Sequence, residues 1–178
     1  MKKTTYKIAL FGILSAVALV LSVLESFIPW SGVMPPGAKA GFSNIATMFA
    51  ATSLGFPAAM AITLIKALFA GVTRGFTAML MSLSGGVLST AVMYLLFKHT
   101  KRMGYMPIGV LSAISHNAGQ LLAAGVLVGS KAVLGYAPVL LISAIVTGAV
   151  TGTVLRAVIP AINKTVNNMN SYEHKGGR

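Results

Sequence analysis

The chain is short of charged residues, above all of acids, and it contains no cysteine. Only 9% of its 178 residues are charged, and two acids, Glu25 and Glu173, stand against 14 Lys and Arg, giving a formal net charge of +12. So few acids exclude a paired-carboxylate hydrolase, a carboxylate-rich metal site and a di-acidic magnesium motif. The lack of cysteine excludes disulfides, thiolate metal sites and a cysteine nucleophile.

Apolar residues take the place of the missing charge. They make up 56% of the chain, whereas an average soluble domain carries about 25% charged residues. A nucleic-acid surface needs its cations on a solvated face interleaved with aromatic residues, but here the cations separate long apolar runs. The composition therefore predicts a membrane protein that does not bind nucleic acid.

The charge-free runs predict the membrane spans, because a helix needs about 20 mostly apolar residues to cross the hydrocarbon core. Four such runs cover residues 8–24, 75–97, 103–130 and 132–155. The run 40–73 contains a single charge, Lys66, and is interrupted by Leu54-Gly55-Phe56-Pro57. It is either one overlong span or two short spans that turn at Gly55–Pro57.

The distribution of Lys and Arg favours two short spans, since these residues accumulate in cytoplasmic loops. With six spans, ten of them lie inside and three, Lys39, Arg74 and Lys131, lie outside; one overlong span gives at best eight against five. We expect an all-α, six-helix, multi-pass protein of the cell membrane with both termini cytoplasmic. Residues 1–162 form its single transmembrane domain, and residues 163–178 form a short disordered cytoplasmic tail.

Several polar residues lie within or next to these spans, where an ionisable group is costly and is by default a functional hypothesis. Under the six-span topology they fall at the midplane or in the outer half, and Ser112, His116 and Gln120 form a stripe at i, i+4 and i+8 with Asn117 adjacent. Three cations face one carboxylate, so an anionic or strongly polar ligand entering from outside would satisfy the group. The predicted substrate-binding residues are Glu25, Lys39, Asn44, Lys66, Arg74, His116, Asn117 and Gln120.

Structural explanations for the same residues stay open at this point. Lys39 and Arg74 are also typical of loop residues that meet lipid phosphates, and Lys66 of a side chain that snorkels outward along its helix. Glu25 would then pair with Lys66 or Arg74. His116 and its polar neighbours would form hydrogen bonds between helices that only hold the bundle together.

Two apparent catalytic motifs fail on inspection. The spacing from Gly32 to Gly37 resembles a phosphate loop, but Lys39 comes one position late and the two intervening prolines remove amide donors. The segment 82–86 (Ser-Leu-Ser-Gly-Gly) is no esterase elbow, because it lies within a span and has no acid partner for a triad. We expect no catalytic residue, no metal site and no cofactor.

Small residues recur four positions apart, which lets helices approach closely in lipid. The pairs Gly71/Gly75, Gly119/Ala123 and Gly148/Gly152 indicate packing within the bundle. The pair Gly12 and Ala16 belongs to a first helix that is small on much of its circumference, and it predicts docking of a second membrane protein.

Three segments together resemble the Gx transporter family: 36–45 (Pro-Gly-Ala-Lys-Ala-Gly-Phe-Ser-Asn-Ile), 82–89 (Ser-Leu-Ser-Gly-Gly-Val-Leu-Ser) and 116–120 (His-Asn-Ala-Gly-Gln). This family is often labelled heptaprenyl diphosphate synthase component I, and it is grouped with the membrane S components of energy-coupling factor (ECF) vitamin transporters. The resemblance covers most of the chain, roughly from the first span to the sixth.

The resemblance implies six helices with a substrate pocket near the outer surface. It also implies partners, a transmembrane T protein and two cytoplasmic ATPases, which dock through small residues of the first helix. The usual Ala-x-x-x-Ala pattern is absent here, and its nearest equivalent is the segment from Gly12 to Ala16.

The function that we expect is that of a substrate-binding membrane subunit for uptake of a small vitamin-like or anionic solute. The alternative is a non-catalytic membrane subunit of isoprenoid or quinone metabolism that binds a prenyl or quinone ligand, and a third is a purely structural subunit. Catalysis of prenyl transfer conflicts with the residues, because that reaction needs acidic magnesium ligands.

Overall fold

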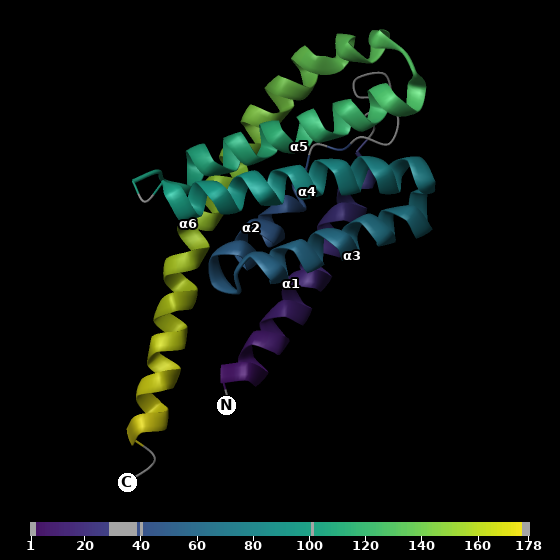
Figure 1. Cartoon of the computed structure of the whole chain (residues 1–178). Coiled ribbons are helices and arrows are strands. Elements are labelled where there is room, and N and C mark those ends of the chain that lie inside the picture. Colours follow the sequence, from purple (N-terminus) through teal and green to yellow (C-terminus); the bar gives the residue numbers. More distant parts are fainter. Residues whose placement is uncertain (1–2, 29–38, 40, 101, 176–178) are drawn as a thin grey trace.

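The computed structural model describes residues 3–28, 39, 41–100 and 102–175, and these residues form helices without a strand. The helices are α1 (Lys3–Ser26), α2 (Asn44–Ser53), α3 (Phe56–Arg74), α4 (Phe76–His99), α5 (Tyr105–Val128) and α6 (Ala137–Lys175), with a short 3-10 helix, η1 (Lys131–Tyr136), before α6. Figure 1 shows α3, α4 and α5 lying side by side, with the start of α1 and the end of α6 on the same side of the molecule. The predicted all-α class is confirmed.

Five of the six α-helices in the described chain are long and apolar enough to cross a membrane. The exception is α2, whose 10 residues reach about 15 Å, half of a hydrocarbon core of about 30 Å. Of the six expected spans, five are therefore long enough to cross the membrane, and α2, one of the two short spans expected within residues 40–73, is not. Helix length depends on where the helix begins as well as on hydropathy, and α2 begins only at Asn44 although the apolar run starts at residue 40.

The predicted turn between α2 and α3 is confirmed. Helix α2 gives way at Leu54, and α3 begins at Phe56 with Pro57 in its first turn. Gly55 has φ of 92°, a conformation that side chains with a Cβ rarely adopt. Proline is tolerated in the first turn of a helix, because a backbone N–H at that position has no acceptor within the helix and its absence costs no hydrogen bond. Gly55 and Pro57 together let the chain turn from α2 into α3 over a very short connection.

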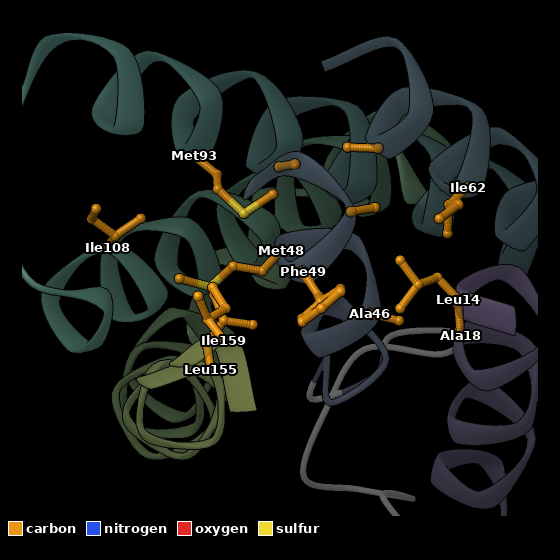
Figure 2. Close-up of a cluster of buried hydrophobic side chains, with 13 residues drawn as sticks. Leu14, Ala18, Ala46, Met48, Phe49, Ile62, Met93, Ile108, Leu155 and Ile159 are labelled. Carbon is orange, nitrogen blue, oxygen red and sulfur yellow. The ribbon is translucent and has the colours of Figure 1, made fainter. Parts of the chain in front are cut away.

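Helix α2 lies at the centre of the larger apolar cluster, which we call the α2 core. Residues 46–51 of α2 are all buried. Figure 2 shows Met48 beside Leu155 and Ile159 of α6, and Ala46 toward Leu14 and Ala18 of α1. The full cluster comprises Leu14, Ala18, Ala46, Met48, Phe49, Ala50, Ala51, Ala59, Ile62, Met93, Ile108, Leu155 and Ile159. Its many alanines let the surrounding helices approach a short helix closely.

Two of the predicted small-residue pairs make close contacts between helices. A Cβ added at Gly119 of α5 would lie 2.7 Å from the carbonyl oxygen of Ser84 on α4. A Cβ at Gly148 of α6 would lie 2.7 Å from the carbonyl oxygen of Gly109 on α5. Contacts this short leave no room for a side chain, so these glycines let the backbones of α4, α5 and α6 meet.

The end of the chain differs from the predicted disordered tail. Helix α6 contains Pro160 and continues to Lys175, beyond the expected boundary at residue 162. Between Pro160 and the glycines at 176 and 177 the sequence has neither glycine nor proline. Because polarity alone does not end a helix, the segment 163–175 stays helical without a residue that would break it.

Candidate functional site

A small polar cavity lies at the N-terminal end of α2. It is lined by Ser22, Glu25, Lys39, Gly41, Ser43, Lys66, Arg74, Ser82, His116 and Gln120, which we call the polar cavity. Six of the eight predicted substrate-binding residues are among them. Its volume of about 10 Å³ is the least that a single water molecule needs. The side chains therefore fill the space between the helices almost completely.

The chain enters the middle of the bundle before α2 begins. Gly41 and Ser43, which precede α2, line the cavity together with Lys66 from the middle of α3 and His116 from the middle of α5. Non-helical backbone is tolerated at membrane depth only where protein surrounds it and satisfies its polar groups. The polar side chains of the cavity meet this demand.

Glu25 satisfies the backbone of this entering segment. The carboxylate is only 2% exposed, and its Oε1 atom accepts hydrogen bonds from the amides of Gly41 and Phe42. These amides precede the positive end of the α2 dipole, where a negative charge is stabilising. Among the described residues Glu25 forms no ion pair with Lys66 or Arg74, so the structure does not support the predicted pairing.

Lys66 is buried and points to α2 rather than to the surface. The side chain is 5% exposed, and its Nζ donates a hydrogen bond to Oδ1 of Asn44 over 2.8 Å. This contact excludes the interpretation that Lys66 snorkels outward. Asn44 does not line the cavity itself but holds the cation beside it, and the other amide atom of Asn44, Nδ2, has no partner.

Lys39 fills the cavity from the segment before α2. The side chain is buried, and its Nζ donates to the carbonyl oxygen and to Oγ of Ser22, the latter over 3.2 Å. Its backbone N–H donates to Oε1 of Gln120 over 3.4 Å. Burial and the neighbouring Arg74 lower the pKa of Lys39 to about 8, against a smaller opposing effect of Glu25. Lys39 is therefore a partner of α1 and α5 and not an exposed loop cation.

His116 and Gln120 form the α5 wall of the cavity. They lie one turn apart on the same face of α5, and Nε2 of His116 is 2.9 Å from Nε2 of Gln120. Both side chains are at least 95% buried. The close contact of Gly119 with α4 brings this face of α5 to its place beside the chain before α2.

Asn117 is the exception among the predicted site residues of α5. Its Nδ2 donates to the carbonyl oxygen of Leu140 on α6 over 2.7 Å, and it lines a different, mostly apolar hollow of about 220 Å³ between α5 and α6. Adjacent residues of a helix point about 100° apart, so Asn117 does not share the face of His116. The structure places Asn117 outside the polar cavity, and its role in substrate binding stays a prediction. The structure supports its alternative role as helix glue.

Three serines that line the cavity, Ser22, Ser43 and Ser82, are not among the residues predicted from the sequence. Ser22 lies three residues before Glu25 on α1, so the helical repeat offered a signal for it. Ser82 lies in one of the three segments that carry the family resemblance. Ser43 precedes α2 and carried no signal of its own.

The predicted docking pair lies on an open part of α1. Gly12 and Ala16 are both exposed, and a Cβ at Gly12 would meet no other atom within 4 Å. Gly12 and Ala16 are therefore accessible to another molecule. The membrane protein that would dock there stays a prediction.

The cavity combines an excess of positive charge with unsatisfied polar atoms. Lys39, Lys66 and Arg74 face the single carboxylate of Glu25. Glu25 Oε2 and Asn44 Nδ2 have no hydrogen-bond partner, although buried polar groups in proteins rarely lack one. No three His, Asp or Glu side chains in the described part of the chain gather as metal ligands. The arrangement has the chemistry to bind an anion that also forms directed hydrogen bonds.

One protein family matches most of the chain. The family described as heptaprenyl diphosphate synthase component I matches residues 14–158, which include every helix of the bundle in whole or in part. Comparison with curated proteins finds no match, and comparison with solved structures finds none either.

Proposed function

Because this chain belongs to the heptaprenyl diphosphate synthase component I family, which is also the Gx transporter family, we propose that it is a substrate-binding membrane subunit. In this proposal it takes up a small anionic or vitamin-like solute, as the S components of ECF transporters do. The observation that carries the proposal is the polar cavity, where three cations and one carboxylate converge among apolar helices. Such a group is too costly in a membrane to serve packing alone.

The binding step follows from the charges. Lys66 and Arg74 supply donors from α3, and an anion beside them would neutralise part of the excess positive charge. Because the cavity holds only about 10 Å³, a solute enters only when the Lys39 side chain gives up its bonds to Ser22. The ligand thus replaces an internal cation.

The chain itself would not catalyse prenyl transfer in this proposal, despite the family description. Its only acids are Glu25 and Glu173, and Glu25 is engaged with the backbone before α2. Without a nucleotide loop, energy for uptake would come from a partner, a T protein with its ATPases. Gly12 and Ala16 of α1 are the proposed docking residues.

Native mass spectrometry of the detergent-purified protein tests the binding role. We expect a small anion to co-purify with the wild type and to be lost at least tenfold in Lys66→Met and Gln120→Leu. Lys98→Met is the matched control, because Lys98 is exposed at the end of α4. Equal retention in all four proteins would contradict the assignment of the cavity.

Thermal stability separates binding from packing in the same variants. Lys66→Met removes a buried cation, which is favourable, but leaves Asn44 Oδ1 without its donor at a cost of about 1–3 kcal/mol. These effects oppose each other, so we expect a melting temperature within about 4 °C of the wild type. A large loss of stability with ligand retention unchanged would reduce Lys66 to a structural role.

Single-cysteine labelling tests the orientation, since the chain has no cysteine of its own. In the proposed topology Ala132→Cys lies outside and Thr100→Cys lies inside. An impermeant thiol reagent should therefore label the first variant in intact cells and the second only after lysis. The reverse labelling pattern would contradict the proposed topology and with it uptake from the outer side.

A docking test uses the exposed pair on α1. We expect Gly12→Leu or Ala16→Leu to abolish co-purification with a T protein and uptake while the bound anion is kept. Val20→Met, an exposed apolar change on the same helix, is the control. Uptake that survives both leucine variants places the partner surface elsewhere.

A second candidate is binding of a prenyl or quinone ligand, and one observation favours it. A groove of about 720 Å³ between α4 and α5 is lined almost wholly by apolar side chains, among them Leu83, Val87, Leu122 and Val126. A prenyl chain has the shape and the polarity that such a groove accepts. The mass spectra decide between the candidates, because a co-purified prenyl lipid whose retention depends on Val87 and Leu122 rather than on Lys66 would favour this one.

A further inference from the structure

The acceptors around the Lys39 ammonium group share one helix. Ser22 of α1 offers both its carbonyl oxygen and its Oγ to Nζ of Lys39. Glu25 lies three residues further along α1 and lines the same cavity. Residues three apart on a helix are neighbours on its surface, so these oxygens belong to one patch.

Glu25 has acceptor capacity that the fold does not use. Its Oε1 atom holds the amides of Gly41 and Phe42, but Oε2 has no donor although the side chain is 2% exposed. A buried charged oxygen without a donor is expensive. We call the carbonyl oxygen and Oγ of Ser22 together with Oε2 of Glu25 the α1 acceptor group.

The α3 side of the cavity has the opposite character. Lys66 and Arg74 of α3 are donors only, and Asn44 Nδ2 is a further donor without a partner. A ligand that carried only negative charge would use these donors and leave Ser22 Oγ and Glu25 Oε2 without a donor once Lys39 withdrew, whereas the carbonyl oxygen of Ser22 also accepts from Oγ of Ser26. The two halves of the cavity therefore demand different groups from one ligand.

We propose that the α1 acceptor group is a subsite for an N–H-bearing group of the ligand, such as an amine or a ring N–H, and that Lys39 occupies it in this structure. The ligand is then an anion that also carries an N–H donor, for example an amino acid-like or nitrogen-heterocyclic acid. This inference rests on the proposed function and names its substrate class. In this structure the Lys39 ammonium group holds the two oxygens of Ser22, so it competes with the N–H group of the ligand for these two, while Oε2 of Glu25 is open to the ligand.

Chemical rescue of a truncated Lys39 tests the subsite without knowledge of the natural ligand. Lys39→Ala removes the ammonium group and leaves space for methylammonium, which is small and donates N–H bonds. We expect methylammonium at a saturating concentration to raise the melting temperature of purified Lys39→Ala by about 2–4 °C. The wild type should show no such shift, because Lys39 already fills the subsite.

Matched variants and probes identify the oxygens. Tetramethylammonium carries the same charge without an N–H donor and should not rescue Lys39→Ala. Lys39→Met fills the space of the side chain and should not respond to methylammonium. In the double variant Lys39→Ala/Glu25→Gln we expect the shift to fall to less than half. If Lys39→Ala yields no folded protein, Lys39→Val, whose side chain is shorter than that of lysine and carries no N–H donor, replaces it in the same measurements.

Three results would overturn the inference: no shift with methylammonium, an equal shift with tetramethylammonium, or a shift that persists undiminished when Glu25 becomes Gln. None of them depends on uptake, so they are distinguishable from a failure of the proposed function. Anion retention that depends on Lys66, combined with absent rescue, removes only the N–H subsite. Rescue combined with no co-purified anion keeps the subsite and removes the uptake role.

Discussion

The body of α2 and its N-terminal end are both buried, but their surroundings differ in polarity and charge. Its body is enclosed by the α2 core, in which Met48, Ile62 and Leu155 are at least 98% buried. Its N-terminal end meets the polar cavity, where Lys66 is also buried but carries charge. In the first region the clustered side chains are apolar, so close packing is enough for them. In the second each polar atom needs a particular partner, and some lack one.

This difference separates stability from function within a few residues. Close packing in the α2 core gains dispersion energy from many small contacts. The polar cavity lowers the stability of the fold, because buried cations without full counter-charge are unfavourable. We expect substitutions in the core to lower stability, whereas substitutions in the cavity should change binding more than stability.

The largest effect should come from the α2 core itself. Met48→Ala leaves a cavity where a side chain 1% exposed meets α6, and we expect a loss of about 2–5 kcal/mol. Denaturation in detergent measures it. The control is Met106→Ala, because Met106 is 50% exposed and its loss should be small. Equal losses at both positions would contradict the central role of α2.

A smaller effect should follow from the helix contact that supports the cavity. Gly119→Ala places a Cβ 2.7 Å from the Ser84 carbonyl oxygen, and separating α4 from α5 should cost about 1–3 kcal/mol. It should also weaken anion retention, because His116 and Gln120 move with α5. Gly125→Ala is the control on the same helix, since a Cβ there meets nothing within 4 Å. A stable Gly119→Ala variant would show that α4 and α5 have room to separate.

A third prediction concerns a satisfied polar pair away from the cavity. The hydroxyls of Thr63 on α3 and Thr90 on α4 are 2.9 Å apart, and both side chains are at least 98% buried. Thr63→Val should cost about 0.6–1 kcal/mol, as interhelical hydrogen bonds in membranes do. Ligand retention should not change. A change in retention without a change in melting temperature would extend the functional region beyond the polar cavity.

The last prediction concerns pH and the burial of Lys39. The pKa of Lys39 falls from 10.5 to about 8 on folding, so between these values the unfolded chain binds more protons than the folded one. Stability therefore rises with pH through this window. Subtracting the melting curve of Lys39→Met from that of the wild type isolates the contribution of Lys39. A difference that falls as pH rises from 8 to 10.5 would contradict the burial of its ammonium group.

Much of the fold was predictable from local sequence. The long apolar runs gave α1, α3, α4, α5 and α6, since hydropathy and length set a membrane helix. The turn at Gly55 was predictable from Gly and Pro, whose backbone preferences act within one residue. The composition of the site was partly predictable too, because a buried ionisable group in an apolar run stands out regardless of its neighbours.

The partners of those groups were not predictable in the same way. Glu25 binds the amides of Gly41 and Phe42 rather than Lys66, and backbone amides leave no trace in a sequence. Asn117 faces α6 while His116 faces the cavity, because the orientation of a helix about its axis is set by its packing.

The sequence by itself determined that this protein is an all-helical membrane protein of its family, with a cation-rich polar group among apolar helices. These properties follow from residue types and from spacing along single helices, which act locally. Only the tertiary structure decided that α2 is a short central helix, that the chain enters the bundle before it, and that Lys39 occupies an acceptor group on α1. Such features arise from contacts between residues far apart in the chain, where Gln120 meets Lys39 across 81 positions, and packing selects these contacts.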